Sequence, residues 1–148
     1  MIKTNKFWFV VVAVLSIVFC RTQLWAQAEP TNILTEHIVW NATKAYNQNR
    51  ANDEVIYNCS FITNKSSSLK WRQKNGERVT DYSVTSVEGN WQDLKSDGQI
   101  TYYIKKNNVT GTATFARSDG KYTIHLKMAV NGKPDIDYFF YIDNIDKV

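Results

Sequence analysis

Histidine and aspartate carry the most versatile side-chain chemistry in this chain, and neither type is spaced as a catalytic set or a metal site. The two histidines, His37 and His125, have no cysteine or second histidine at metal-ligand spacing. Four aspartates gather near the C-terminus: Asp135, Asp137, Asp143 and Asp146. General acid–base catalysis needs a carboxyl group buried enough to raise its pKa, whereas these carboxylates fall on a polar strand face or at its ends. We therefore expect surface roles for both residue types, and no metal.

Nucleophile and cofactor motifs are also missing from the sequence. It contains no Gly-x-Ser-x-Gly turn and no glycine-rich phosphate loop. Cys59 alternates with polar neighbours at a position that favours burial, so we expect an inert thiol, with a reactive thiol as the alternative. The sequence thus predicts a protein that is not an enzyme and needs no cofactor. The alternative is an enzyme site of tyrosines and aspartates at a barrel mouth.

Aromatic residues are the most informative chemical feature. Eight Tyr, four Phe and three Trp lie beyond residue 28, many of them at apolar positions of alternating segments. Such rings form either a filled core or the wall of a cavity, since an eight-stranded barrel can do both. The candidates for lining a ligand cavity are Trp40, Tyr57, Phe61, Trp71, Tyr102, Phe115, Tyr138 and Phe140. Phe139 and Tyr141 fall on the opposite strand face, next to Tyr103 if the strands pair as expected, and are candidates for a surface contact with a partner.

These rings are positioned by segments in which apolar and polar residues alternate, the pattern of a strand with one buried face. Seven such segments are clear: 55–62, 69–74, 82–86, 99–104, 109–115, 122–130 and 136–143. An eighth, 34–46, fits either a helix or a strand with Tyr46 on the same face as Trp40, and its β-branched residues favour the strand. Residues 88–97 show no such alternation and form a connection. Trp91 and Leu94 within it are expected to fold over an open end of the sheet.

Turn residues separate the segments. Asn-Gly or Asp-Gly pairs stand at 75–76, 97–98, 119–120 and 131–132, and Asn-Asn at 107–108. These pairs tolerate the positive φ of tight hairpins, and tight hairpins join antiparallel strands. The sequence therefore predicts an all-β antiparallel meander of about eight strands in one domain, residues 29–148. A closed barrel removes exposed edges and is favoured, while a half-open barrel and a sandwich share the same local pattern.

Residues 1–28 have the three-part layout of a secretory signal peptide. A basic start precedes an apolar run over 7–19, and Ala26-Gln27-Ala28 supplies small residues for cleavage. The apolar run is shorter than the roughly 20 residues that span a membrane. Removing the peptide leaves fifteen basic and fourteen acidic residues, with the cations spread singly, unlike a nucleic-acid binder. We expect an exported protein, periplasmic or extracellular, with no membrane span after cleavage and no nucleic-acid partner.

The strand rhythm of residues 36–146, the signal peptide and Trp40 in the first strand together resemble the lipocalin-like eight-stranded secreted barrels. Lipocalins mark their first strand with Gly-x-Trp, whereas Ile38 stands two residues before Trp40 here. The resemblance therefore implies the fold and no particular binding residues. The chain is also similar to small exported β proteins of Bacteroidetes.

The leading hypothesis from the sequence is a non-enzymatic binding protein that holds a small apolar or aromatic ligand in the barrel interior. One alternative is an envelope protein-interaction module that uses the exposed aromatic face. Another is an exported β protein whose core is simply filled. An outer-membrane barrel is disfavoured, because charged residues occupy the polar faces and bulky rings the apolar ones.

Overall fold

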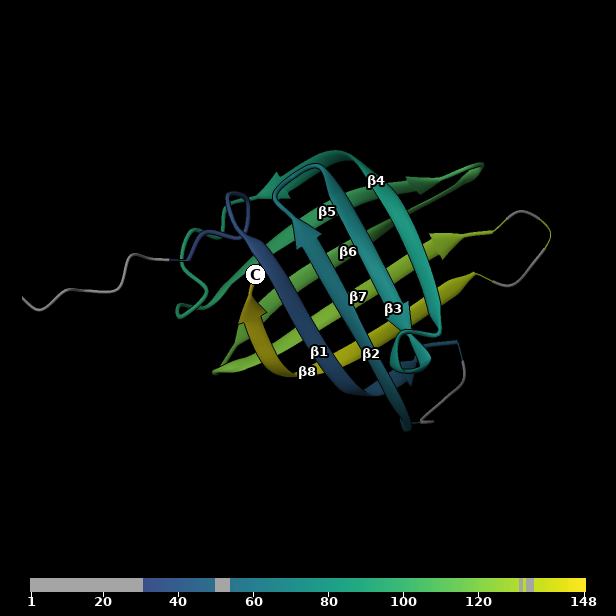
Figure 1. Cartoon of the computed structure of the whole chain (residues 1–148), viewed down its shortest axis with the longest axis horizontal. Helices are drawn as coiled ribbons and strands as arrows, with labels where there is room; N and C mark the ends of the chain where they lie inside the picture. The colour runs from purple at the N-terminus through teal and green to yellow at the C-terminus, as the bar shows by residue number, and fades with distance from the viewer. Residues whose placement is uncertain (1–30, 50–53, 131, 133–134) are drawn as a thin grey trace, which may run out of the picture.

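The computed structural model describes residues 31–49, 54–130, 132 and 135–148, and it shows eight strands in an antiparallel meander (Figure 1). In chain order they are β1 His37–Asn47, β2 Glu54–Asn64, β3 Ser68–Gln73, β4 Arg78–Gly89, β5 Gly98–Lys106, β6 Val109–Ser118, β7 Lys121–Ala129 and β8 Ile136–Lys147. A turn of 3-10 helix, η1 Lys74–Gly76, joins β3 to β4. The expected signal peptide, residues 1–28, lies outside the described residues.

The meander closes on itself because β1 pairs with β8 as well as with β2. All other pairings join strands that are consecutive in the sequence. The predicted all-β antiparallel meander is confirmed, and its closure excludes the half-open barrel and the sandwich. Within the described part of the chain, no helix has the length and apolar character needed to cross a membrane.

Most of the expected turn residues adopt the left-handed backbone that tight hairpins need. Positive φ angles occur at Asn75 (55°), Asn107 (54°) and Asp119 (51°). The Asp97-Gly98 pair differs, because Gly98 already begins β5 and Asp97 ends a longer connection from β4. Asn131 lies outside the described residues.

A β-bulge at Thr43 changes the expected face of the residues that follow it. Residues 37–47 form a strand, as predicted, but the register shifts between Ala42 and Lys44. The Thr43 backbone N–H and hydroxyl both donate to Asp143 Oδ2, at 2.9 and 2.7 Å, which fixes the bulge against β8. Ala45 is consequently buried, and Tyr46 lies on the outer face opposite Phe139. The prediction that Tyr46 shares the face of Trp40 was wrong.

A second bulge lies in β4, between Val84 and Ser86. It places Val87 opposite the buried Tyr102, while Ser86 pairs with the outward Tyr103. The strict alternation expected through Ser86 therefore fails at this point.

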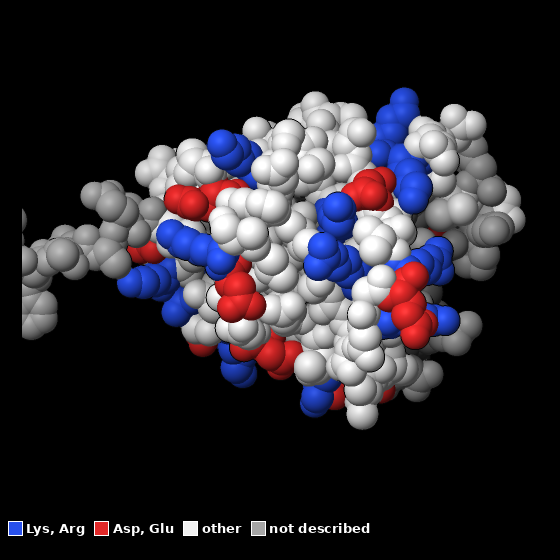
Figure 2. All heavy atoms as spheres, viewed as in Figure 1, with Lys and Arg blue, Asp and Glu red and all other residues white. Residues whose placement is uncertain are grey.

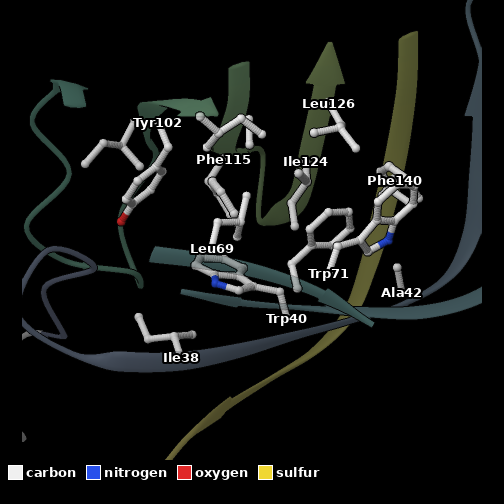
Figure 3. Packing of buried hydrophobic residues seen from close by; sticks show 14 of the residues in the cluster. Ile38, Trp40, Ala42, Leu69, Trp71, Tyr102, Phe115, Ile124, Leu126 and Phe140 are labelled. Carbon is white, nitrogen blue, oxygen red and sulfur yellow. The ribbon is translucent and has the colours of Figure 1, made fainter. Parts of the chain in front are cut away.

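The inward-facing hydrophobic side chains form one buried cluster inside the barrel (Figure 3). Trp40 lies 4.9 Å from the Phe115 ring centroid, and Phe61 stacks on Trp71 at 5.5 Å. The Trp40 indole N–H donates to the buried Thr63 hydroxyl at 3.2 Å. Apolar burial and ring contacts of this kind are the main stabilising terms of such a core.

One end of the barrel is plugged, and we call it the closed end. It carries the segment before β1 and the connection between β4 and β5, at the left of Figure 1. Ile33, Trp91 and Leu94 from these segments are at most 6 % exposed, which confirms that Trp91 and Leu94 fold over an end of the sheet. Leu94 N–H donates to Thr31 O, and the Tyr122 hydroxyl donates to Leu94 O at 2.7 Å.

Candidate functional site

The opposite end of the barrel, which we call the open end, carries η1 and the connections β1–β2, β5–β6 and β7–β8. A cavity of about 250 Å³ lies there, lined by Tyr57, Trp71, Gln73, Arg78, Ile136, Tyr138 and Phe140. We call this the mouth cavity. Its volume lies just below the lower limit of typical small-molecule sites, roughly 300 Å³. It suits a ligand of about one ring with a short side chain.

Four aromatic rings form the apolar wall of the mouth cavity. The Trp71 and Phe140 ring centroids are 5.7 Å apart in an edge-to-face arrangement, and Tyr138 lies 6.1 Å from Phe140. Tyr57 lies 6.3 Å from Trp71 and completes this wall. Phe140 and Trp71 are buried at its base, while Tyr57 and Tyr138 are half-buried nearer the rim. Such a wall favours a flat apolar group.

Polar groups at the mouth cavity are paired with one another across strands. The Tyr57 hydroxyl donates to Gln73 Oε1 at 2.7 Å, and Gln73 is only 5 % exposed. Asn47 Nδ2 donates to the Tyr138 hydroxyl at 3.3 Å. Arg78 is exposed and pairs with Gln73 in the register of β3 and β4, so it begins β4 at the rim.

Burial and the nearby cation act in opposite directions on the tyrosines here. Burial raises the pKa of the Tyr57 hydroxyl, and the Arg78 guanidinium lowers it by a smaller amount. Burial likewise raises the pKa of Tyr82 to about 12, again with a smaller opposing effect from Arg78. The guanidinium is therefore close enough to place a positive potential over this side of the mouth cavity.

The predicted cavity residues divide into two groups. Tyr57, Trp71, Tyr138 and Phe140 line the mouth cavity. Trp40, Phe61, Tyr102 and Phe115 are fully buried in the packed part of the barrel and do not line it. Four of the eight candidates thus belong to the buried core, and the other four line a cavity at the open end.

Sequence reasoning missed three lining residues: Gln73, Arg78 and Ile136. Gln73 holds an inward position after Leu69 and Trp71, and a buried glutamine there is the one signal that polar contacts are needed inside. Arg78 follows a turn, where a surface cation is the ordinary expectation.

The two predicted surface residues lie on the outer face of β8. Tyr141 is 45 % exposed. Phe139 is half-buried and stacks on His125 at 3.9 Å. The expectation that they lie next to Tyr103 was wrong, because β6 and β7 separate β5 from β8. Tyr103 instead donates to Glu88 at 2.6 Å.

Acidic and basic side chains are interspersed on the outer surface (Figure 2). His125 Nε2 lies 2.7 Å from Asp137 Oδ1. Asp146 accepts from Asn41 at 2.9 Å. Among the residues the structure describes, no group of three or more His, Cys, Asp or Glu side chains is placed to hold a metal ion.

Cys59 lies on β2, which pairs with β1 and β3, and its side chain is buried. Burial raises the pKa of its thiol to about 11, and the Trp71 indole N–H beside it lowers that pKa only partly. That N–H makes no hydrogen bond of normal geometry within the described residues. A thiol with so high a pKa is protonated, and therefore unreactive, at neutral pH.

Comparisons with known proteins identify no relative: no family model matches the chain, and no curated protein or solved structure matches it significantly.

Proposed function

We propose that this chain is an exported, non-enzymatic binding protein of lipocalin-like design that holds a small ligand with an aromatic or apolar body in the mouth cavity. The observation that carries the proposal is the contrast inside the barrel. Buried rings cluster with the other core side chains along the barrel, and at the open end four rings line a cavity of about 250 Å³. Binding sites of this type combine apolar walls with a few fixed polar groups, as Gln73 and Tyr57 supply here.

The layout of residues 1–28 supports the proposal of export, and the expected cleavage after Ala28 makes export measurable. The intact mass of protein recovered from a secreting bacterial host should correspond to a chain that begins at Glu29. An unprocessed chain retained in the cytoplasm would contradict export without bearing on the cavity.

The binding test uses neutral, ring-sized compounds: indole, p-cresol and phenylacetamide. Isothermal titration calorimetry on the mature protein should detect saturable binding of at least one of them. Ile136→Trp, which fills the mouth cavity from β8, should weaken that binding by about tenfold or more, because the ligand loses the space in which it is buried.

The matched control is Ile56→Trp, which adds the same ring on the outside of the barrel, where Ile56 is 85 % exposed. It should bind as the parent does. Tyr138→Leu supplies a second test at the wall, since it removes a ring without filling the cavity, and it should also weaken binding. If neither these three compounds nor an aromatic acid of the same size binds, or if Ile136→Trp and Tyr138→Leu bind like the control, the proposal is rejected.

An interaction module on the outer face is the second candidate. It is favoured by the exposure of Tyr141 and Ile56. Both residues are register partners of Lys44, Tyr141 from β8 and Ile56 from β2, so the three lie in one row across the outer face. Phe139 contributes less, because His125 already covers one of its faces. The double variant Phe139→Ser, Tyr141→Ser should leave small-molecule binding at the mouth cavity unchanged. Loss of that binding in a variant that still folds would favour the outer face of β8, rather than the mouth cavity, as the binding surface.

A further inference from the structure

Arg78 is the one charged residue among the described residues that line the mouth cavity. Its strand begins one residue after η1, and its Cα partner in the register is the inward Gln73. The guanidinium lies near enough to both Tyr57 and Tyr82 to oppose the effect of burial on their pKa values. The positive charge therefore acts on the cavity itself as well as on the solvent outside.

No described carboxylate lies within ion-pair distance of Arg78. The described residues hold five ion pairs: Lys44–Glu54, Lys70–Asp81, Arg117–Asp97, His125–Asp137 and Lys127–Asp137. None of them involves a residue that lines the cavity, and none of the described lining residues is acidic. The mouth cavity thus has a net positive lining.

The hydrogen-bonding groups at the mouth cavity leave donors in excess. Gln73 Oε1 already accepts from Tyr57, which leaves the Gln73 amide NH₂ as the free end of that side chain. The Tyr138 oxygen accepts from Asn47, which leaves its own O–H to donate. Arg78 adds a guanidinium with five N–H donors and no acceptor. A ligand that fits this set must itself be an acceptor.

We infer that the ligand is a small aromatic monocarboxylate, with its carboxylate on the Arg78 guanidinium and its ring against Trp71 and Tyr138. The inference rests on the proposed function and deepens it by naming the ligand class. A planar guanidinium fork matches the two oxygens of a carboxylate. A single lining cation balances one negative charge, which fits a carboxylate better than a dianionic phosphate.

The experiment compares phenylacetate with phenylacetamide, which has the same ring and nearly the same shape but no charge. Calorimetry on the mature protein at low ionic strength should give a dissociation constant for phenylacetate about five- to tenfold lower, the scale of a charge-assisted hydrogen bond at a partly exposed site. Raising the ionic strength should reduce the preference, because salt screens exposed charges.

The variant Arg78→Gln should abolish the preference for the acid, because it weakens phenylacetate binding more than phenylacetamide binding, while Arg78→Lys should retain part of the preference. The matched control is Arg72→Gln, which removes the same charge from the outer face of neighbouring β3, where Arg72 is exposed. It should bind both compounds as the parent does.

The outcomes separate this inference from the function on which it rests. Equal binding of the two compounds by the parent, or an acid preference that survives Arg78→Gln, overturns the monocarboxylate inference and leaves the binding proposal in place. If neither phenylacetate nor phenylacetamide binds, and indole and p-cresol also fail to bind, then both the monocarboxylate inference and the binding proposal are overturned. A preference lost equally in Arg78→Gln and Arg72→Gln also overturns the inference, because it shows only the effect of net charge.

Discussion

The two ends of this barrel use the same residue types for different purposes. At the closed end, Arg117 lies 2.6 Å from Asp97 and 5.5 Å from the centre of the Tyr122 ring, and the Tyr122 hydroxyl bonds to the backbone at Leu94. At the open end, Arg78 has no carboxylate partner among the described residues.

The difference lies in what each end has to cover it. The connection between β4 and β5 supplies Trp91 and backbone carbonyls, so the Trp91 indole N–H and the Tyr122 hydroxyl at the closed end both donate hydrogen bonds within the fold. At the open end η1 supplies no buried residue, and among the described side chains Tyr57 donates its hydroxyl hydrogen bond to Gln73. One end is closed by packed side chains, and the other keeps hydrogen-bond donors and a cavity, which is the contrast that the proposed binding function rests on.

The largest effect that tests this comparison is expected from Trp91→Ala. The indole is 2 % exposed, donates to Ser96 O and contacts Trp40 and Tyr122, so its loss should lower the free energy of unfolding by about 3–5 kcal/mol. Tyr138→Ala, at the open end, removes a half-buried ring and should cost roughly half as much, in proportion to the area it buries. Urea denaturation measures both values. Equal costs would mean that the closed end is not the better-packed one.

Gly98→Ala should produce the next largest effect. A Cβ at this position overlaps the Trp91 ring, and such overpacking costs about 1–3 kcal/mol. The physical reason predicts non-additivity: the cost should nearly vanish in a Trp91→Ala background, where the ring is absent. A double-mutant cycle by urea denaturation checks this. If the two costs simply add, Gly98 is required for a reason other than the plug.

Alkaline pH should separate Tyr82 from Tyr102. Burial raises the pKa of both hydroxyls, that of Tyr82 to about 12, and only Tyr82 has Arg78 nearby to oppose the shift. The folded chain then keeps protons that the unfolded chain releases near pH 10, so stability is full below pH 10 and is lost as the pH rises towards 12. The urea midpoint should fall over this range in the parent, less steeply in Tyr82→Phe, and least steeply in Tyr102→Phe. Identical slopes in all three proteins would contradict these shifts.

Much of the fold could be predicted from the sequence, because the alternation of apolar and polar residues within each strand indicates which face of that strand is buried. Ile100, Tyr102 and Ile104 alternate with polar residues, and they are indeed buried. The two bulges could not be read in this way. The bulge at Thr43 depends on Asp143, a hydrogen-bond partner one hundred residues away, and only the closure of β1 on β8 brings the two together.

The candidate site was predictable in its rings but not in its position. An inward ring looks the same in sequence whether another side chain or empty space lies beside it, so Trp40 and Trp71 could not be distinguished. Trp40 is covered by Trp91, whereas Trp71 lines the mouth cavity. This difference arises because the strand directions place Trp91 at the end of the barrel nearer to Trp40. Arg78 was missed for a related reason: it follows a turn, and its inward position is set by its register with Gln73.

The smallest effect compares the two arginine environments directly. Asp97→Asn removes the charge that pairs with Arg117 and weakens the acceptor for the Asp119 N–H, and it should cost up to about 1 kcal/mol at these partly exposed positions. Arg78→Gln breaks no described ion pair and should change the free energy of unfolding by less than about 0.5 kcal/mol. Urea denaturation of the ligand-free proteins resolves the two cases. If Arg78→Gln proves the more destabilising, the guanidinium at the open end is a structural group, and the division between a stabilising end and a binding end fails.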